Sequence, residues 1–323
     1  MTDNQQDMTY RQLGASGLTV STVGIGCNNF GGRMADEDVP TVVDAAIDAG
    51  ITLFDVADMY GKAPGVSEIQ LGEALGSRRD DVVLATKFGL DMGGVNGPDW
   101  NARGSRRYIV RAAEASLRRL GTDWIDLYQY HAPDALTPIE ESLAALDDLV
   151  TSGKVRYVGH SNFAGWQIAE AEFTARSGGY TPFISAQNPY NLLDRRLERE
   201  VVPAVEAYGL GVLPYFPLAN GLLTGKYRRN EVPEGSRLTH SRQNVLDTAD
   251  WDQLEAYSAF AAERGVSEVQ VAFSWLAAQP AVGSVIAGAT TPQQVRQNAG
   301  AADWTPTDED LAELDRIFPA PTA

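Results

Sequence analysis

The sequence predicts a single (β/α)8 (TIM) barrel, an α/β fold, with an N-terminal β-hairpin and long loops at the C-terminal face. Eight short runs of β-branched and aromatic residues alternate with segments whose apolar residues recur at helical spacing. Two of these runs, DVVLATK (81–87) and VGSVIAG (282–288), are nearly continuous in apolar residues, as in parallel strands covered on both faces. The length of 323 residues is normal for one such barrel with insertions.

The expected strands follow one another at regular intervals along the chain. They are at residues 22–26, 52–57, 81–87, 124–131, 155–162, 183–188, 211–217 and 284–288. The helices between them are clearest at 40–49 and 105–120, each followed by a glycine, and at 137–151, which begins with Thr-Pro and ends before Ser-Gly. Strands that alternate with helices favour a parallel sheet closed into a barrel.

Three segments interrupt this alternation. Residues 11–20 place a Gly-rich turn between two extended pieces, which predicts a hairpin ahead of the barrel. Residues 91–107 and 219–250 form long loops after the third and seventh strands. Such loops lie at the C-terminal face of a barrel, where active sites are built. No repeat, linker or low-complexity block divides residues 1–323, so one domain is expected.

An open, doubly wound sheet is the competing fold class. Its dinucleotide-binding fingerprint is G-x-G-x-x-G directly after the first strand. Here the segment that begins with Gly24 and Gly26 has Asn29 where the third glycine should stand. The stretch from Gly221 to Tyr227 lacks one spacer residue of a P-loop and has Tyr in place of Ser or Thr. Neither segment supports the open sheet.

The composition is that of a globular, acidic protein. The 43 acidic residues outnumber the 26 basic residues, and the formal net charge of −17 argues against nucleic acid or an anionic membrane as the main partner. Cys27 is the single cysteine, so no intrachain disulfide can form. Residues 1–7 are polar, without the apolar core of a signal peptide, and no run approaches 18 apolar residues. A cytoplasmic location is therefore expected.

Four polar residues are expected at the C-terminal ends of three adjacent strands. Asp55 lies in the second strand and Tyr60 in the loop after it, whereas Lys87 and His131 end the third and fourth strands. Each alone has a structural explanation, since a tyrosine in a loop or a histidine in a core is common. A lysine within an apolar run needs a charged partner, however, and Asp55 is the obvious one. The four side chains at one rim are candidate catalytic residues.

The chemistry that these side chains suggest is proton transfer to a carbonyl group. A free tyrosine has a pKa of about 10 and is a poor acid at neutral pH, so the Lys87 ammonium is expected to lower the pKa of Tyr60. Asp55 would keep Lys87 charged, and His131 would donate a hydrogen bond to the carbonyl oxygen. The hydride must come from a cofactor, because none of these groups is a reductant. No metal site is expected, because the three histidines are scattered along the chain.

The sequence resembles the aldo-keto reductase superfamily over nearly its whole length. The matching motifs are Arg11-x-Leu13-Gly14-x-Ser16-Gly17-Leu18, Asp55-x4-Tyr60-Gly61, Thr86-Lys87, Tyr128-x2-His131, Gly153-Lys154-x-Arg156-x2-Gly159-x-Ser161-Asn162, Gln187-x2-Tyr190-Asn191 and Gly221-x2-Thr224-Gly225-Lys226-Tyr227. The resemblance implies a (β/α)8 barrel that binds NADP(H) without a Rossmann unit. It also implies reduction of an aldehyde or ketone to an alcohol, with hydride from the nicotinamide and the proton from Tyr60. Asp55, Lys87 and His131 complete the catalytic tetrad of that family.

The same resemblance implies cofactor and substrate positions. Ser161, Asn162 and Gln187 match residues that hold the nicotinamide carboxamide, and Tyr215 matches an aromatic residue that stacks on its ring. The remaining cofactor positions are Gly26, Pro217, Leu218, Ala219, Gly221, Lys226, Arg237, Gly288, Thr290, Gln294 and Asn298. The substrate, a small-molecule carbonyl compound, would be bound by Asn28, Phe30 and Trp100.

Departures from the family pattern leave the cofactor and the role open. Gly288, Ala289 and Gln294 stand where many members have Lys-Ser and Arg for the 2′-phosphate, and Gln297 replaces a common Glu. NADP(H) is expected, with NAD(H) as the alternative. The pattern is closer to bacterial general-stress and sugar-aldehyde reductases and to potassium channel β subunits than to the aldose reductase group. An NADP(H)-binding regulatory subunit with little turnover and an alcohol or sugar dehydrogenase working in the oxidative direction are the alternative functions.

Overall fold

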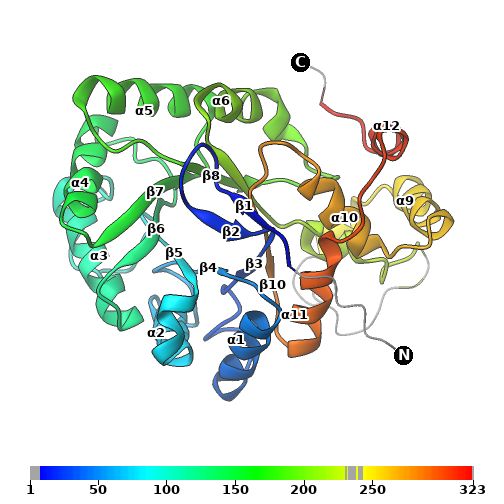
Figure 1. The fold of residues 1–323 in the computed structure, drawn as a ribbon, viewed down its shortest axis with the longest axis horizontal. Coiled ribbons are helices and arrows are strands. Elements are labelled where there is room, and N and C mark those ends of the chain that lie inside the picture. The colour runs from blue at the N-terminus through cyan, green and yellow to red at the C-terminus, as the bar shows by residue number, and fades with distance from the viewer. Residues whose placement is uncertain (1–7, 230, 232–237, 239–242, 322–323) are drawn as a thin grey trace.

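The computed structural model describes residues 8–229, 231, 238 and 243–321, and Figure 1 shows a barrel of strands inside a ring of helices. The barrel strands are β3 (Val23–Gly26), β4 (Leu53–Asp55), β5 (Val83–Phe88), β6 (Ile125–Tyr130), β7 (Val155–Ser161), β8 (Ser185–Pro189), β9 (Gly211–Tyr215) and β10 (Val285–Gly288). They are all parallel and hydrogen-bonded in the order β10-β3-β4-β5-β6-β7-β8-β9. The predicted fold class is confirmed.

Strands β9 and β10, which stand at the two ends of this order, are joined through the residues directly before β10. The backbone N–H of Val212 donates to the carbonyl of Ala281 at 2.7 Å, and the N–H of Gly283 donates to the carbonyl of Val212 at 2.9 Å. Val212 and Val282 form a parallel bridge. These bonds join β9 to the segment before β10 and so close the barrel.

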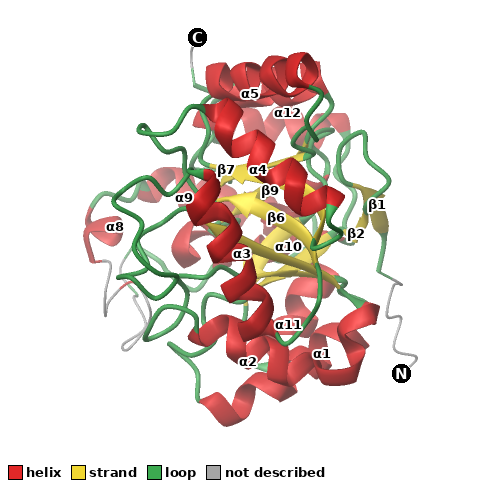
Figure 2. Ribbon diagram, turned by 90° about the vertical axis from the view of Figure 1, so that its left-hand side faces the viewer, coloured by secondary structure: helices red, strands yellow, loops and turns green. Residues whose placement is uncertain are grey.

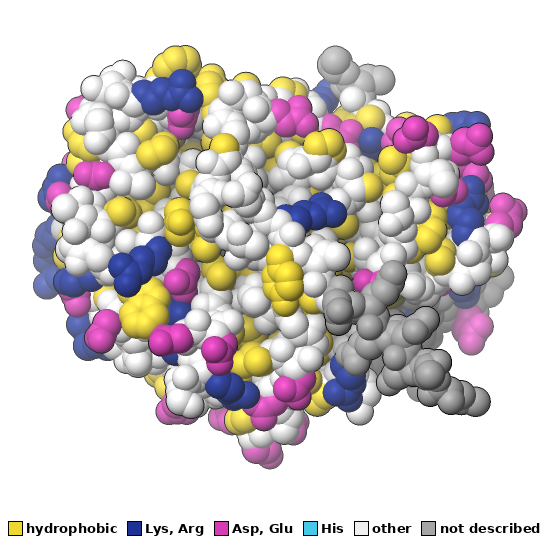
Figure 3. Space-filling model, viewed as in Figure 1, with side chains coloured by type: hydrophobic (Ala, Val, Ile, Leu, Met, Phe, Trp, Pro, Cys, Tyr) yellow, Lys and Arg dark blue, Asp and Glu magenta, His cyan; other side chains and the backbone are white. Residues whose placement is uncertain are grey.

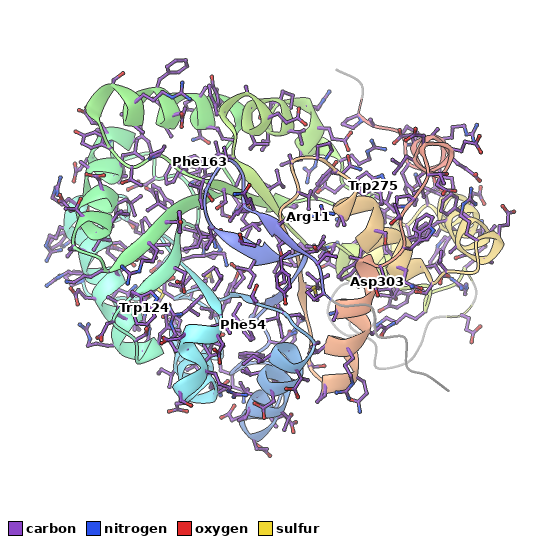
Figure 4. All side chains as sticks on the ribbon, viewed as in Figure 1. Arg11, Phe54, Trp124, Phe163, Trp275 and Asp303 are labelled. Carbon is purple, nitrogen blue, oxygen red and sulfur yellow. The ribbon has the colours of Figure 1, made fainter. Side chains whose placement is uncertain are left out.

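Helices cover the outside of the barrel (Figure 1). They are α1 (Val39–Asp48), α2 (Val66–Leu75), α3 (Arg106–Leu120), α4 (Ile139–Thr151), α5 (Gly165–Gly178), α6 (Val201–Tyr208), α9 (Trp251–Glu263), α10 (Glu268–Ala277), α11 (Pro292–Ala299) and α12 (Asp308–Ile317). The three helices that the sequence predicted most clearly correspond to α1, α3 and α4. Helix α3 is capped at its N-terminus by Ser105, whose hydroxyl accepts from the backbone N–H of Tyr108, and at its C-terminus by Gly121, which has a φ of 64°. Phe163 and Trp275, labelled in Figure 4, are buried in the layer between strands and helices.

The predicted hairpin, β1 (Tyr10–Gln12) with β2 (Thr19–Ser21), closes one end of the barrel. Its apolar side chains share a buried cluster with residues of the barrel strands. The members of this cluster are Leu13, Leu18, Val20, Leu53, Ala85, Leu127, Leu213 and Ile286. Arg11, labelled in Figure 4, donates from Nη1 to the carbonyl of Ala277 at 2.6 Å and so ties the hairpin to the end of α10.

The long loops lie at the opposite end of the barrel. Figure 2 shows α8 (Gln243–Asp247) and its neighbouring loops on the side away from β1 and β2. The segment after β9 also contains the short 3-10 helix η4 (Ala219–Thr224). On the hairpin face, which Figure 3 views, acidic and basic side chains are interspersed. No helix of the described ranges is long and apolar enough to cross a membrane.

Candidate active site

The ends of β4, β5 and β6 bring the four candidate catalytic side chains together. The fully buried Lys87 donates from Nζ to Asp55 Oδ2 at 2.6 Å and to the carbonyl of Val56 at 2.9 Å. The same Nζ lies 5.2 Å from the centre of the Tyr60 ring. The rings of Tyr60 and His131 meet edge to face, with centroids 6.0 Å apart. An ammonium, a phenol and an imidazole therefore lie within one small region.

The charge pair of Asp55 and Lys87 is fully hydrogen-bonded despite its burial. Asp55 Oδ1 accepts from Nε2 of Gln129 at 3.0 Å and from Nε2 of Gln187 at 2.9 Å, while Lys87 occupies Oδ2. Burial acts to lower the pKa of Lys87, but Asp55 and Tyr60 outweigh it, and the pKa is raised above its usual value. Lys87 is therefore a cation at neutral pH.

Burial also decides the protonation states of Tyr60 and His131. It raises the pKa of Tyr60 above its ordinary value, although the Lys87 ammonium acts in the opposite direction. The expectation that Lys87 lowers this pKa is wrong in its net direction, because lost hydration of the phenolate outweighs the attraction of one ammonium. Burial, with the Lys87 charge as a second cause, lowers the pKa of His131 to about 3. Both Tyr60 and His131 are therefore neutral at pH 7, and Tyr60 carries its proton.

A cavity of about 790 Å³ runs from Tyr60 and His131 to the start of α11. Most of the positions that the sequence assigned to the cofactor line it. These are Gly26, Ser161, Asn162, Gln187, Tyr215, Pro217, Leu218, Gly221, Lys226, Gly288, Thr290, Gln294 and Asn298. Asn28, assigned to the substrate, also lines it. A long cavity with a proton-transfer group at one end suits a ligand that extends along the barrel rim.

Some of the assigned residues lie elsewhere. Phe30 is fully buried between the strands and the helices, and Trp100 is 69% exposed beneath the guanidinium of Arg107. Neither these two residues nor Ala219 belongs to the cavity wall, and Arg237 lies outside the described residues. The wall also contains residues that the sequence did not assign to a ligand, namely Asn29, Arg33, Phe216, Thr224, Val269, Ile286 and Ala287. Asn220 and Gln297, also in the wall, belong to the segments 217–221 and 288–298 that the resemblance matches to the cofactor.

The carboxyl end of β7 holds a strained asparagine. Asn162 has a φ of 62°, a conformation that costs free energy for any residue with a Cβ and persists where its surroundings enforce it. Its Nδ2 donates to the carbonyl of His131 at 3.0 Å, and its Oδ1 accepts from the Tyr215 hydroxyl at 2.9 Å. The neighbouring Ser161 donates to the carbonyl of Gln187 at 2.7 Å. These bonds fix the amide and the aromatic ring at the cavity wall.

The start of α11 offers neutral polar groups to the other end of the cavity. Thr291 caps the helix by accepting from the N–H of Gln294 at 3.2 Å. Gln294 Oε1 accepts from the backbone N–H of Thr290 at 2.8 Å, which leaves the NH2 of its amide as a donor. At Gly288 an added Cβ would lie 3.0 Å from Asn29 Nδ2, so glycine keeps this part of the rim open.

A second buried polar network, which the sequence did not predict, contacts the end of β5 that carries Lys87. Glu68 accepts from the Thr86 hydroxyl at 2.6 Å and from Arg119 Nε at 2.6 Å. Arg119 also donates to Asn96, and Asn96 Nδ2 donates to Asp58 Oδ2 at 2.9 Å. The backbone N–H of Asp58 donates to the carbonyl of Lys87 at 3.2 Å. The network therefore links the end of β5 to the loop that carries Tyr60.

The polar groups of the cavity fit a nicotinamide dinucleotide. Amide and hydroxyl groups of Ser161, Asn162 and Gln187 gather near Tyr60, where a carboxamide would need donors and acceptors. Lys226 and the N-terminus of α11 lie along the wall, where phosphates would need positive charge and free N–H groups. In the described part of the chain, no group of His, Cys, Asp and Glu could hold a metal ion.

A closed (β/α)8 barrel with a cavity and ionisable residues at its C-terminal face is the architecture of a large class of enzymes. The chain belongs to the aldo/keto reductase family, whose model matches residues 22–318. The resemblance inferred from the sequence motifs is thus confirmed.

Three relatives align with this chain over nearly the whole length of both sequences. An uncharacterized oxidoreductase, YrpG, of Bacillus subtilis (strain 168) is 38% identical over 97% of both chains. A probable voltage-gated potassium channel subunit beta of Oryza sativa subsp. japonica is 38% identical, over 93% of this chain and 92% of its own. An L-glyceraldehyde 3-phosphate reductase of Escherichia coli (strain K12) is 34% identical, over 96% of this chain and 92% of its own. The family and its oxidoreductase members support an enzyme that reduces small carbonyl compounds with a nicotinamide cofactor.

Proposed function

We propose that this protein reduces an aldehyde or ketone to an alcohol, with NADPH as the hydride donor and Tyr60 as the proton donor. The observation that carries the proposal is the buried pair of Lys87 and Asp55 beside a protonated Tyr60 at the end of a long cavity. Burying two charges costs free energy that only close pairing offsets, so such a pair at a cavity points to chemistry there.

The roles of the side chains follow from their protonation states. NADPH, when bound, would supply the hydride. Tyr60 would pass its Oη proton to the carbonyl oxygen, and Lys87 would stabilise the phenolate that remains, since its ammonium lies against the ring. The neutral imidazole of His131 would donate an N–H to the same oxygen. Asp55 would position Lys87 and keep its charge in place.

The cofactor preference follows from the start of α11. Thr290, Gln294 and Asn298 line this end of the cavity as neutral groups. Neutral donors and a helix N-terminus bind a 2′-phosphate more weakly than a guanidinium does. A preference for NADPH over NADH of about 10–100-fold is therefore expected, which corresponds to about 1.4–2.8 kcal/mol.

The test is a comparison of NADPH and NADH oxidation with aldehydes, ketones, sugars and quinones as substrates. We expect turnover with at least one carbonyl class and a higher kcat/KM with NADPH. Gln294→Ala should reduce the preference while leaving NADH use unchanged, because only NADPH carries the 2′-phosphate. Equal or better use of NADH by the unmodified protein would contradict the NADPH assignment and leave the proton-transfer proposal in place.

A regulatory role is the second candidate, because a relative of 38% identity is a probable potassium channel subunit. That role keeps cofactor binding and has little turnover. Tight NADPH binding without reduction of any of the four substrate classes would favour it over the reductase.

A further inference from the structure

The cavity wall contains a cation that the proposed proton transfer does not use. Arg33 follows β3 in the loop to α1 and lines the cavity, as does Lys226 from the segment after β9. Among the described residues of the wall, Asp55 is the one carboxylate, and Lys87 already neutralises it. The described part of the wall is therefore net positive within a chain whose formal charge is −17. A positive cavity in an acidic protein is a site for an anion.

The guanidinium of Arg33 makes no ion pair and no hydrogen bond within the part of the chain that the structure describes. Elsewhere in the same protein, Arg79, Arg119 and Arg264 are each paired with a carboxylate. Acidic residues outnumber basic ones by 43 to 26, so carboxylate partners are plentiful. An arginine that faces a cavity without one keeps its five N–H donors available for a ligand.

The loop that carries Arg33 is fixed on both sides. Asn29 Nδ2 donates to the carbonyl of Ala289 at 3.3 Å, which ties the loop to the segment before α11. The N–H of Lys62 donates to the carbonyl of Gly31 at 2.6 Å, which ties it to the loop after β4. The N–H of Arg33 itself donates to the carbonyl of Asn29 at 3.0 Å. The exposed Arg33 therefore stands on a fixed backbone at the wall of the cavity.

The neighbourhood of Gly288 leaves little room for a second cation at this rim. A Cβ at Gly288 would lie 3.0 Å from Asn29 Nδ2 and 3.3 Å from Asn28 Oδ1. A longer, basic side chain at this position would require these two side chains to shift. Arg33 belongs to the same loop and brings a positive charge to the cavity without such a shift.

We propose that Arg33 is an anion-binding residue of this cavity and that it binds a phosphate group of a ligand. The inference rests on the proposed function, since it places a nicotinamide cofactor and a carbonyl substrate in the cavity. Two sources supply the phosphate: the cofactor, and a phosphorylated aldehyde. A guanidinium binds either one through paired, charge-assisted N–H donors that a lysine does not reproduce.

The experiment uses the full chain and the variants Arg33→Gln and Arg33→Lys. Lys62→Gln is the matched control, because it removes the same charge from the adjacent loop at a residue that does not line the cavity. The first measurement is the Kd for NADPH, by titration of its fluorescence at low and high salt. The second is kcat/KM for L-glyceraldehyde and for L-glyceraldehyde 3-phosphate.

Either of two results supports the proposal and identifies the source of the phosphate. Weaker NADPH binding by Arg33→Gln, by about 10–100-fold at low salt and less at high salt, identifies the cofactor. An unchanged Kd with a loss of about 10–100-fold in kcat/KM for the phosphorylated aldehyde alone identifies the substrate. In both cases Arg33→Lys should recover only part of the loss, and Lys62→Gln should match the unmodified protein.

The proposal is overturned if Arg33→Gln matches Lys62→Gln in both measurements. A failure of the proposed function is distinguishable from this result. If the unmodified protein reduces neither aldehyde, the NADPH titration alone decides the role of Arg33, and the screen of the four substrate classes decides the proposed function.

Discussion

His160, on β7, is a buried histidine whose replacement should make the protein less sensitive to acid. It is fully buried, stacks on Phe163 with ring centroids 4.6 Å apart and meets Phe183 edge to face at 5.2 Å. Neither ring nitrogen has a hydrogen-bond partner in the described part of the protein. Burial lowers the pKa of His160 to about 3. The folded protein therefore holds this imidazole neutral at a pH where an unfolded chain would protonate it.

The magnitude follows from the two pKa values. Between the unfolded value of about 6.5 and the folded value of about 3, protons bind the unfolded chain preferentially, so stability falls as the pH decreases through this window. At about pH 5 the loss from His160 alone is about 2 kcal/mol, because stability falls by about 1.4 kcal/mol for each pH unit below the unfolded pKa. His160→Leu removes this loss. At about pH 7.5 its effect should stay within about 1 kcal/mol, because the removal of two unsatisfied nitrogens offsets the lost ring contacts.

Denaturant titrations of the unmodified protein and His160→Leu at both pH values measure the difference directly. The variant should gain about 2 kcal/mol relative to the unmodified protein on going from about pH 7.5 to about pH 5. Phe183→Leu is the control, because it removes a neighbouring ring without a titratable group and should show no pH-dependent gain. An equal acid sensitivity of His160→Leu and the unmodified protein would show that His160 is not the source of this loss of stability.

Three further predictions concern the site and its support. Lys87→Met should lower turnover at least 100-fold and destabilise the protein by about 3–5 kcal/mol, since its buried carboxylate partner would lose its counter-charge; a stable variant with normal kcat would contradict the pairing. Because the pKa of His131 is about 3 and that of Tyr60 is raised, kcat/KM for carbonyl reduction should be flat from about pH 6 to 9. A break near pH 6.5 in that profile would show that an imidazole titrates during catalysis. Glu68→Gln should destabilise the protein by about 1–3 kcal/mol relative to the exposed control Glu73→Gln in denaturant titrations, and equal stabilities would exclude a role for the buried network.

The barrel could be predicted because its signal is local. Near-continuous apolar runs such as 81–87 are typical of a parallel strand covered on both faces, and the observed β5 spans Val83–Phe88. The convergence of Asp55, Tyr60, Lys87 and His131 could be predicted as well. All parallel strands of a barrel end at the same rim, so residues at the ends of adjacent strands lie close together whatever their sequence separation.

The direction of individual loop side chains could not be predicted. Phe30 and Trp100 were expected at the substrate, yet the first is fully buried and the second is 69% exposed. Their orientation depends on contacts between distant segments, which no local pattern records. The net pKa shift of Tyr60 depends in the same way on the balance between burial and the distance to Lys87.

Some polar residues of the site and its surroundings were not predicted, and they differ in whether the sequence contains any signal for them. Asp58, Asn96 and Arg119 come from separate loops and helices, and no motif spacing connects them. Arg33 had a weak signal, because it is a lone cation in an Asn- and Gly-rich loop directly after the first barrel strand. Loops in that position contribute to the active-site face of a barrel.

The central claim, that Tyr60 donates the proton in an NADPH-dependent reduction, is tested most directly by Tyr60→Phe. The measurement is the single-turnover rate of NADPH oxidation with a reactive aldehyde, together with the Kd for NADPH. We expect an unchanged Kd and a rate lower by about 10²–10⁴-fold, the loss typical of removing a positioned general acid. A rate close to that of the unmodified protein would contradict it.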